Sequence, residues 1–107
     1  MARTDTTLEK DIERKLRKMV ESHGGLCLKW VCPGWSGVPD RIIILPCGRV
    51  IFVETKRPKG GKVSKLQDWW CKRLRGMGFW VVYVRDEVGI KTLELVIKDE
   101  LKGAWQR

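Results

Sequence analysis

Residues 37–56, GVPDRIIILPCGRVIFVETK, decide the fold of this chain. Two runs rich in β-branched residues, 41–45 and 49–55, flank a short turn around Cys47. This pattern is typical of a β-hairpin. Both runs are apolar on both faces. Strands of this kind usually lie in the middle of a covered sheet, so we expect helices to pack on it.

Upstream of the hairpin, the sequence predicts a helix and a further strand. Thr6 and Glu9 have the spacing of a capping box, and apolar residues then recur at helical spacing as far as Val20. Residues 26–31 read as a strand, and the turn-rich segment 32–39 leads from this strand into the hairpin. One helix is therefore predicted to precede three strands.

Downstream of the hairpin, the sequence predicts a second helix and a fourth strand. Ser64 and Gln67 form a second capping box, which opens a helix ending near Gly78, and residues 79–85 read as a strand. Apolar residues within 92–101 recur at helical spacing and predict a helix, although a strand also fits this segment. The resulting order is αβββαβ plus a C-terminal element, which indicates an α/β fold with a mixed sheet flanked by helices.

Length and composition indicate one domain over residues 1–107. With 43% hydrophobic and 33% charged residues the chain is globular in character, which disfavours intrinsic disorder. The longest uncharged apolar run, 42–46, is far too short to span a bilayer, and the N-terminal residues show no signal region. We therefore expect a soluble, cytoplasmic protein without a membrane partner.

The charge balance points to a polyanionic partner. An excess of 22 Lys and Arg over 13 Asp and Glu gives a net charge of +9. The basic residues are spread along the chain instead of gathering in a polybasic tail, which favours nucleic acid over an anionic membrane surface. The four cysteines form no Cys-x-x-Cys pair and His23 is the single histidine, so no structural zinc site is expected.

Two ionisable residues, Glu54 and Lys56, end a strand that otherwise reads as buried, and period-two geometry places both on one face. If the turn is centred on Cys47, opposed residues have numbers that sum to 94, and Asp40 then faces Glu54. Two opposed carboxylates destabilise a sheet unless a cation lies between them, which suggests a magnesium site. The alternatives are a structural salt bridge, or a one-residue slip that sends the two carboxylates to opposite faces.

The first helix offers two further acidic candidates. Glu9 falls near the edge of the apolar stripe and faces inward more than Glu13 does. Glu9 also has a purely structural alternative as the third residue of the capping box, and the same alternative applies to Gln67 in the second box.

The residues Gly37-Val38-Pro39-Asp40, followed after thirteen positions by Glu54-Thr55-Lys56, resemble the PD-(D/E)XK nuclease signature. Together with Leu8-Glu9-Lys10-Asp11-Ile12 and Ser64-x-x-Gln67-x-x-Trp70, they resemble the VRR-NUC (virus-type replication-repair nuclease) family, from about Leu8 to Arg85. The resemblance implies a restriction-endonuclease-like core and a phosphodiesterase that depends on Mg²⁺ or Mn²⁺. Stand-alone members are small homodimers from phages and bacteria that resemble junction resolvases, which implies the cytoplasm of a bacterium or a phage-infected host.

The resemblance also implies catalytic roles for Glu9, Asp40, Glu54, Lys56 and Gln67. Asp40 and Glu54 would bind the metal together with the backbone carbonyl of Thr55, and Lys56 would lie beside the attacking water. Phosphodiester hydrolysis needs a nucleophilic water and neutralisation of charge on the phosphoryl oxygens, and hard oxygen ligands suit the magnesium that supplies both.

A set of basic residues after the second hairpin strand is predicted to hold DNA phosphates: Arg57, Lys59, Lys62, Lys65, Lys72 and Arg73. Most of the six tryptophans are predicted to lie in the core. Trp35, in the loop before Asp40, differs: it could wedge against a base, pack against a second subunit or pack within its own loop.

We therefore expect a divalent-metal-dependent endonuclease that acts on DNA, and on branched DNA such as four-way junctions. The rival hypotheses are a non-catalytic basic module that binds nucleic acid, and a nuclease directed at RNA.

Overall fold

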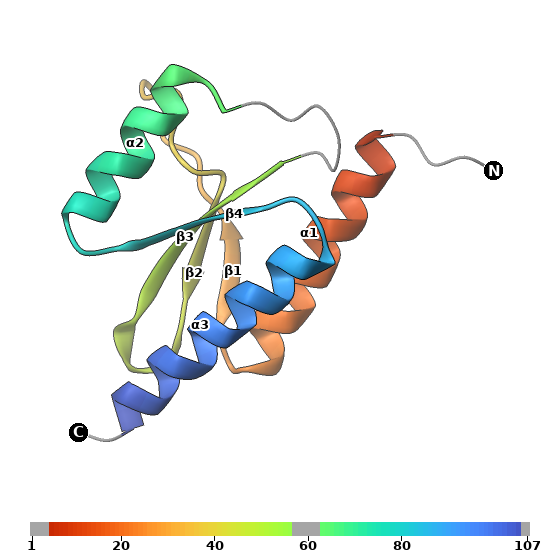
Figure 1. Cartoon of the computed structure of the whole chain (residues 1–107), viewed down its shortest axis with the longest axis vertical. Coiled ribbons are helices and arrows are strands. Elements are labelled where there is room, and N and C mark those ends of the chain that lie inside the picture. The colour runs from red at the N-terminus through yellow and green to blue at the C-terminus, as the bar shows by residue number, and fades with distance from the viewer. Residues whose placement is uncertain (1–4, 57–62, 106–107) are drawn as a thin grey trace.

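The structure is a computed structural model that describes residues 5–56 and 63–105 (Figure 1). The elements follow one another as α1 (Asp5–Ser22), β1 (Leu26–Lys29), β2 (Arg41–Ile44), a short 3-10 helix (Pro46–Gly48), β3 (Val50–Thr55), α2 (Lys65–Gly76), β4 (Trp80–Val84) and α3 (Glu87–Trp105). This order confirms the predicted αβββαβ core and its α/β class.

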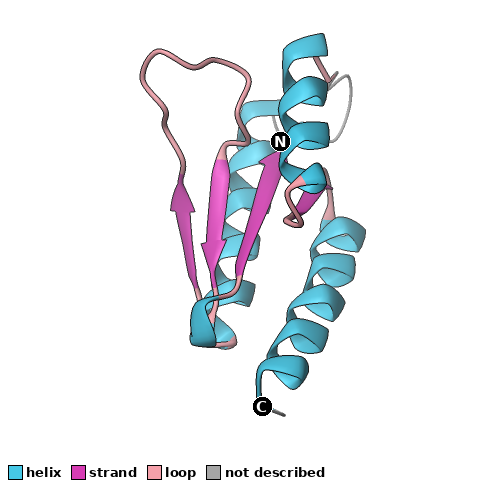
Figure 2. Cartoon of the chain, turned by 90° about the vertical axis from the view of Figure 1, so that its left-hand side faces the viewer, coloured by secondary structure: helices cyan, strands magenta, loops and turns pink. Residues whose placement is uncertain are grey.

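The four strands form one mixed sheet in the order β1-β2-β3-β4. The first three strands are antiparallel neighbours, and a long loop joins β1 to β2 (Figure 2). Strand β4 runs parallel to β3, as expected after a crossover through α2. In the hairpin, Arg41 is opposite Val53 and Ile44 is opposite Val50, which confirms the predicted register. The turn is closed by the N–H of Leu45, which donates to the carbonyl oxygen of Arg49 at 2.8 Å.

Helices cover both faces of the sheet: α1 and α3 lie on one side and α2 on the other (Figure 1). The core on the first side contains Leu16, Ile43, Val53 and Leu93, and the smaller core under α2 is formed by Phe52, Cys71, Leu74 and Val81. Alternation along β3 therefore sends Val53 toward α1 and α3, and Phe52 toward α2. Glu54, two residues after Phe52, follows on the α2 side.

The start of α1 differs from the prediction. The helix begins at Asp5, so Thr6 lies inside its first turn and is not the N-cap. Spacing alone does not show whether Thr6 is the N-cap or lies within the helix. Thr inside a helix is less favourable than Ala by only a fraction of a kcal/mol, so both positions are open to it. The second predicted capping box is confirmed: the N–H of Gln67 donates to Ser64 Oγ at 3.1 Å, and the N–H of Ser64 donates to Gln67 Oε1 at 3.0 Å.

The C-terminal segment is a helix, so the strand alternative is wrong, and α3 begins earlier than the predicted segment. The missed start signal is Asp86, whose Oδ1 accepts a hydrogen bond from the N–H of Gly89 at 2.9 Å and so satisfies a first-turn donor. Ile90, Leu93 and Ile97 then pack into the core at helical spacing. No helix within the described ranges is long and apolar enough to cross a bilayer.

Candidate active site

Asp40 immediately precedes β2 and is tied to the end of β3. Its Oδ1 accepts a hydrogen bond from the backbone N–H of Thr55 at 2.8 Å, and its Oδ2 accepts one from Thr55 Oγ1 at 2.5 Å. On the β1 side, the carbonyl oxygen of Asp40 accepts the N–H of Trp30 at 2.8 Å. The hairpin register and these contacts together bring the carboxylate of Asp40 beside Glu54.

Glu54 has a buried carboxylate whose two oxygens differ in their hydrogen bonding. Only 6% of the residue is exposed. Its Oε1 accepts a hydrogen bond from Gln67 Nε2 at 3.2 Å and lies 3.8 Å from Lys56 Nζ. Its Oε2 has no hydrogen-bond partner among the described residues. Burial, together with the negative charge of Asp40, raises the pKa of the Glu54 carboxyl to about 7, against the opposing effect of the Lys56 ammonium.

Lys56 is held next to this carboxylate by its backbone and by its side chain. Its backbone N–H donates to the carbonyl oxygen of Val84 in β4 at 2.9 Å, which fixes the chain just beyond β3. Its Nζ donates to Gln67 Oε1 at 2.7 Å, and the residue is 8% exposed. A buried ammonium thus lies between an amide oxygen and a carboxylate, where its charge is compensated.

Gln67 connects the two charged groups while it also caps α2. The amide oxygen accepts hydrogen bonds from Lys56 Nζ and from the N–H of Ser64, and the amide nitrogen donates to Glu54. The capping and active-site interpretations of Gln67 are therefore compatible, because one side chain makes both sets of contacts.

The donor set fits a divalent cation of the magnesium type. The Oε2 of Glu54 has no hydrogen-bond partner among the described residues, and Asp40 adds a second carboxylate beside it. Among the side chains that the structure describes, which leave out Asp5, Glu9 and Cys47, no group of three or more His, Cys, Asp or Glu is suited to a metal. This smaller set still suits Mg²⁺, which binds through one or two carboxylates and keeps several waters.

Of the two acidic candidates in α1, the structure describes the side chain of Glu13 and not that of Glu9. Glu13 forms an ion pair with Arg41, with Oε2 2.9 Å from Nη2, so its carboxylate is already compensated next to Asp40. Glu9 lies one turn earlier in α1, and its side chain is outside the described part of the chain. The Glu13–Arg41 pair was missed because nothing in the spacing links a helix acid to the first residue of β2.

The predicted phosphate-binding residues fall into two groups. Lys65, Lys72 and Arg73 are exposed on α2, where Lys72 Nζ lies 2.8 Å from Asp68 Oδ2. Arg57, Lys59 and Lys62 lie outside the described residues.

The prediction that most tryptophans lie in the core is wrong. Trp35, Trp69 and Trp80 are exposed at 65%, 52% and 49%, and Trp30 and Trp70 are only partly buried. Periodicity assigns a residue to a face but does not show whether another element covers that face, and an indole is often too large to be buried completely.

Comparisons with known proteins agree with this architecture. No family model matches the chain. It is 43% identical over 74 residues to a protein named "Putative nuclease p44" from Acyrthosiphon pisum secondary endosymbiont phage 1, and the match covers 69% of this chain and 78% of that protein. A solved structure described as a VRR_NUC domain superposes with a TM-score of 0.75 at 31% identity, over 80% of this chain and 92% of that one. On this similarity of sequence and fold, the chain belongs to the VRR-NUC family of nucleases.

Proposed function

We propose that the protein is a divalent-metal-dependent endonuclease that hydrolyses phosphodiester bonds in DNA, and that it prefers branched DNA such as four-way junctions. The observation that carries the proposal is the buried Glu54 carboxylate, which has one unpaired oxygen, lies beside Asp40 and contacts Lys56 and Gln67. Such an arrangement is costly for folding alone, so it favours a site that a cation and a phosphate complete.

Asp40, Glu54 and the backbone carbonyl of Thr55 would hold Mg²⁺ or Mn²⁺. The cation would supply a water of lowered pKa and neutralise charge on the phosphoryl oxygens. Asp40 is already oriented by its two hydrogen bonds to Thr55, so little side-chain motion is needed to present it.

Lys56 would act on the attacking water and on the phosphate that this water approaches. Its Nζ donates to Gln67 Oε1 at 2.7 Å, which holds the ammonium beside the Glu54 carboxylate. An ammonium at this position can orient a water toward the phosphorus atom and stabilise negative charge as it develops in the transition state. Gln67 would act as a positioning residue, because it contacts both Lys56 and Glu54.

The net charge of +9 supports a nucleic-acid substrate. Junction preference and a homodimer with two active sites rest on the family resemblance, since a junction with two-fold symmetry requires two symmetric cuts.

The test is cleavage of a labelled four-way junction, a linear duplex and a single strand by purified protein, each in Mg²⁺, Mn²⁺ or EDTA. Lys56→Ala is the control for contaminating nuclease. We expect cutting that depends on the metal, favours the junction and is lost in Lys56→Ala while binding persists. Binding without cutting in any metal would contradict the enzyme and leave a basic binding module. Faster cutting of RNA than of DNA in competition would contradict the substrate class.

A further inference from the structure

We propose that an exposed aromatic groove beside the active site binds unpaired nucleobases of the substrate by stacking. The groove is formed by Trp35, Lys65, Leu66, Trp69 and Trp70, and it encloses about 540 Å³. The inference rests on the proposed function and deepens it, because it names the part of the nucleic acid that this nuclease would recognise outside the scissile phosphate.

The groove is built around Trp70, which holds two other indoles at its edges. The rings of Trp35 and Trp69 meet Trp70 at centroid distances of 5.8 and 5.1 Å, with interplanar angles of 86° and 87°. Trp70 itself is anchored, since its Nε1 donates to the carbonyl oxygen of Ser36 at 3.0 Å. Edge-to-face contacts leave much of the outer rings uncovered, in accord with the high exposure of Trp35 and Trp69.

The backbone keeps this groove preformed. Gly37 adopts φ +87°, and a Cβ added there would lie 2.6 Å from Leu66 Cγ, so the loop before Asp40 packs directly on the first turn of α2. A large apolar surface that is exposed to solvent and has rigidly held walls is typical of a recognition site.

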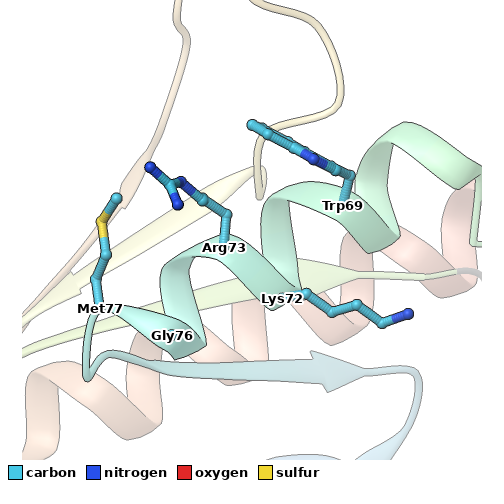
Figure 3. A pocket seen from close by; sticks show the side chains of 5 residues that line it. All are labelled: Trp69, Lys72, Arg73, Gly76 and Met77. Carbon is cyan, nitrogen blue, oxygen red and sulfur yellow. The ribbon is translucent and has the colours of Figure 1, made fainter.

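Charge distinguishes a nucleic acid from other occupants. Lys65 lines the groove itself, and Lys72 and Arg73 line an adjoining hollow of about 330 Å³ that shares Trp69 (Figure 3). Figure 3 shows Trp69 and Arg73 projecting from the same side of α2. No acidic residue lines either hollow among the described residues. Aromatic faces next to cations match bases and phosphates, whereas a second copy with a net charge of +9 would bring like charge.

The groove and the active site are built on the same two segments, the start of α2 and the loop before Asp40. Gln67, which contacts Lys56 and Glu54, lies between Leu66 and the tryptophans in the same turn of α2. Ser36, which anchors Trp70, lies on the loop that leads to Asp40. A strand with its bases in the groove would therefore be held close to the carboxylates. In an intact duplex the base faces are already stacked, so the groove would select unpaired nucleotides of the kind found at a branch point or a flap.

The test is the binding of a short labelled single strand in EDTA, compared with a strand of equal length in which the bases are replaced by abasic sites. The two probes carry the same charge and differ in the presence of the bases. We expect the wild-type protein to bind the strand that carries bases about tenfold or more tightly. Trp35→Leu/Trp69→Leu, which retains apolar volume without aromatic faces, should lose this preference with an unchanged salt dependence. Trp80→Ala, which removes an exposed tryptophan outside the groove, should keep it.

Equal binding of the two probes by the wild-type protein, or an undiminished preference in the double variant, would overturn the inference. A wild-type dimer that becomes a monomer in the double variant, as measured by sedimentation, with the base preference unchanged, would instead identify the groove as an interface between copies. Metal-dependent cutting of duplex by the wild-type protein is measured in parallel. If the wild-type protein does not cut duplex in any metal but still prefers the strand that carries bases, the proposed function is contradicted and the groove is not.

Discussion

Gln67 holds two parts of the molecule in place with one amide group. Its oxygen accepts from the ammonium of Lys56 at 2.7 Å and from the N–H of Ser64 at 3.0 Å, while its nitrogen donates to Glu54 at 3.2 Å. Because a lysine can only donate, the amide oxygen must face Lys56, and the nitrogen is then directed to the carboxylate. A single rotamer thus links the start of α2 to the charged pair.

Substitution can separate the two roles of Gln67. Ser64→Ala removes the cap and should lower the free energy of unfolding by about 1 kcal/mol, with cleavage little affected. Gln67→Ala also removes the partner of Lys56 and Glu54, and should lower kcat by roughly 10- to 100-fold, as expected for hydrogen bonds to charged groups. Chemical denaturation and single-turnover cleavage measure the two effects. Equal losses of kcat in both variants would contradict the positioning role.

The pKa of Glu54 predicts how metal-free stability depends on pH. The unfolded carboxyl has a pKa of 4.5, and the folded one has a pKa of about 7, so between these values the folded protein retains a proton that the unfolded chain releases. The stabilising effect of this proton is complete below pH 4.5 and is lost as the pH rises through 7. Glu54→Gln should therefore be more stable than wild type at pH 8 in EDTA, by roughly 1 to 3 kcal/mol, with a smaller difference at pH 5.

Denaturation of both proteins at the two pH values tests this. Asp99→Asn, which changes an exposed carboxylate on α3, is the matched control and should show no such dependence. A Glu54→Gln variant that is less stable than wild type at pH 8 would show that the buried carboxylate is compensated without a metal.

At the level of secondary-structure elements, the loop between β1 and β2 and the start of α2 support each other. Gly37 brings the loop backbone against Leu66, and Trp70 binds the carbonyl of Ser36. Asp40 follows in the chain, directly before β2, so the packing of the loop on α2 helps to place one of the two carboxylates.

Two glycine variants isolate this packing. Gly34 and Gly37 have similar φ values, +84° and +87°, but a Cβ at Gly34 meets nothing within 4 Å. Gly34→Ala should thus report backbone strain alone, about 1 to 2 kcal/mol. Gly37→Ala should cost a further 1 to 3 kcal/mol, roughly, because it also collides with Leu66, and it should slow cleavage. Thermal unfolding and cleavage rates of the pair provide the measurement. Equal losses of stability in the two variants would show that the loop moves away from Leu66 without a loss of free energy.

For the whole molecule, the excess positive charge is carried mainly by the segment after β3 and by α2, whereas basic and acidic residues balance in α1 and nearly balance in α3. Nonspecific affinity for DNA should therefore depend strongly on salt, with a slope set by the number of phosphates contacted.

Lys59→Ala and Lys62→Ala should each lower the affinity for duplex DNA and flatten the dependence of log K on log salt by roughly 0.9. Lys98→Ala, which is exposed on α3, the helix on the face of the sheet opposite α2, is the control and should leave the slope unchanged. Binding titrations at several salt concentrations, in EDTA, measure the slopes. An unchanged slope in both variants would remove the two lysines from the DNA interface.

The hairpin could be predicted from sequence because two local rules agree on it. The turn around Cys47 sets the register, and alternation along β3 sets the faces, so Asp40 is placed opposite Glu54 without knowledge of the tertiary structure. The cap of α2 was predictable for the same reason, since Ser64 and Gln67 interact within one turn.

The features that could not be predicted depend on contacts between distant segments. The pairing of Glu13 with Arg41 joins α1 to β2, and the aromatic groove joins the loop before β2 to α2. The exposure of Trp35 and Trp69 follows from the absence of a covering element among the described residues, which local periodicity does not encode.

The hydrogen bond between the N–H of Lys56 and the carbonyl of Val84 has a consequence for protein synthesis. On the ribosome, β2 and β3 can pair as soon as the hairpin has emerged, but the anchor for the lysine arrives only with β4. We expect a chain that stops after α2 to contain every signature residue and to cut no DNA, which translation of a message truncated at Gly78 would test. Cutting by that fragment would show that the hairpin alone positions the lysine. The order of synthesis would thus delay nuclease activity until β4 has been made.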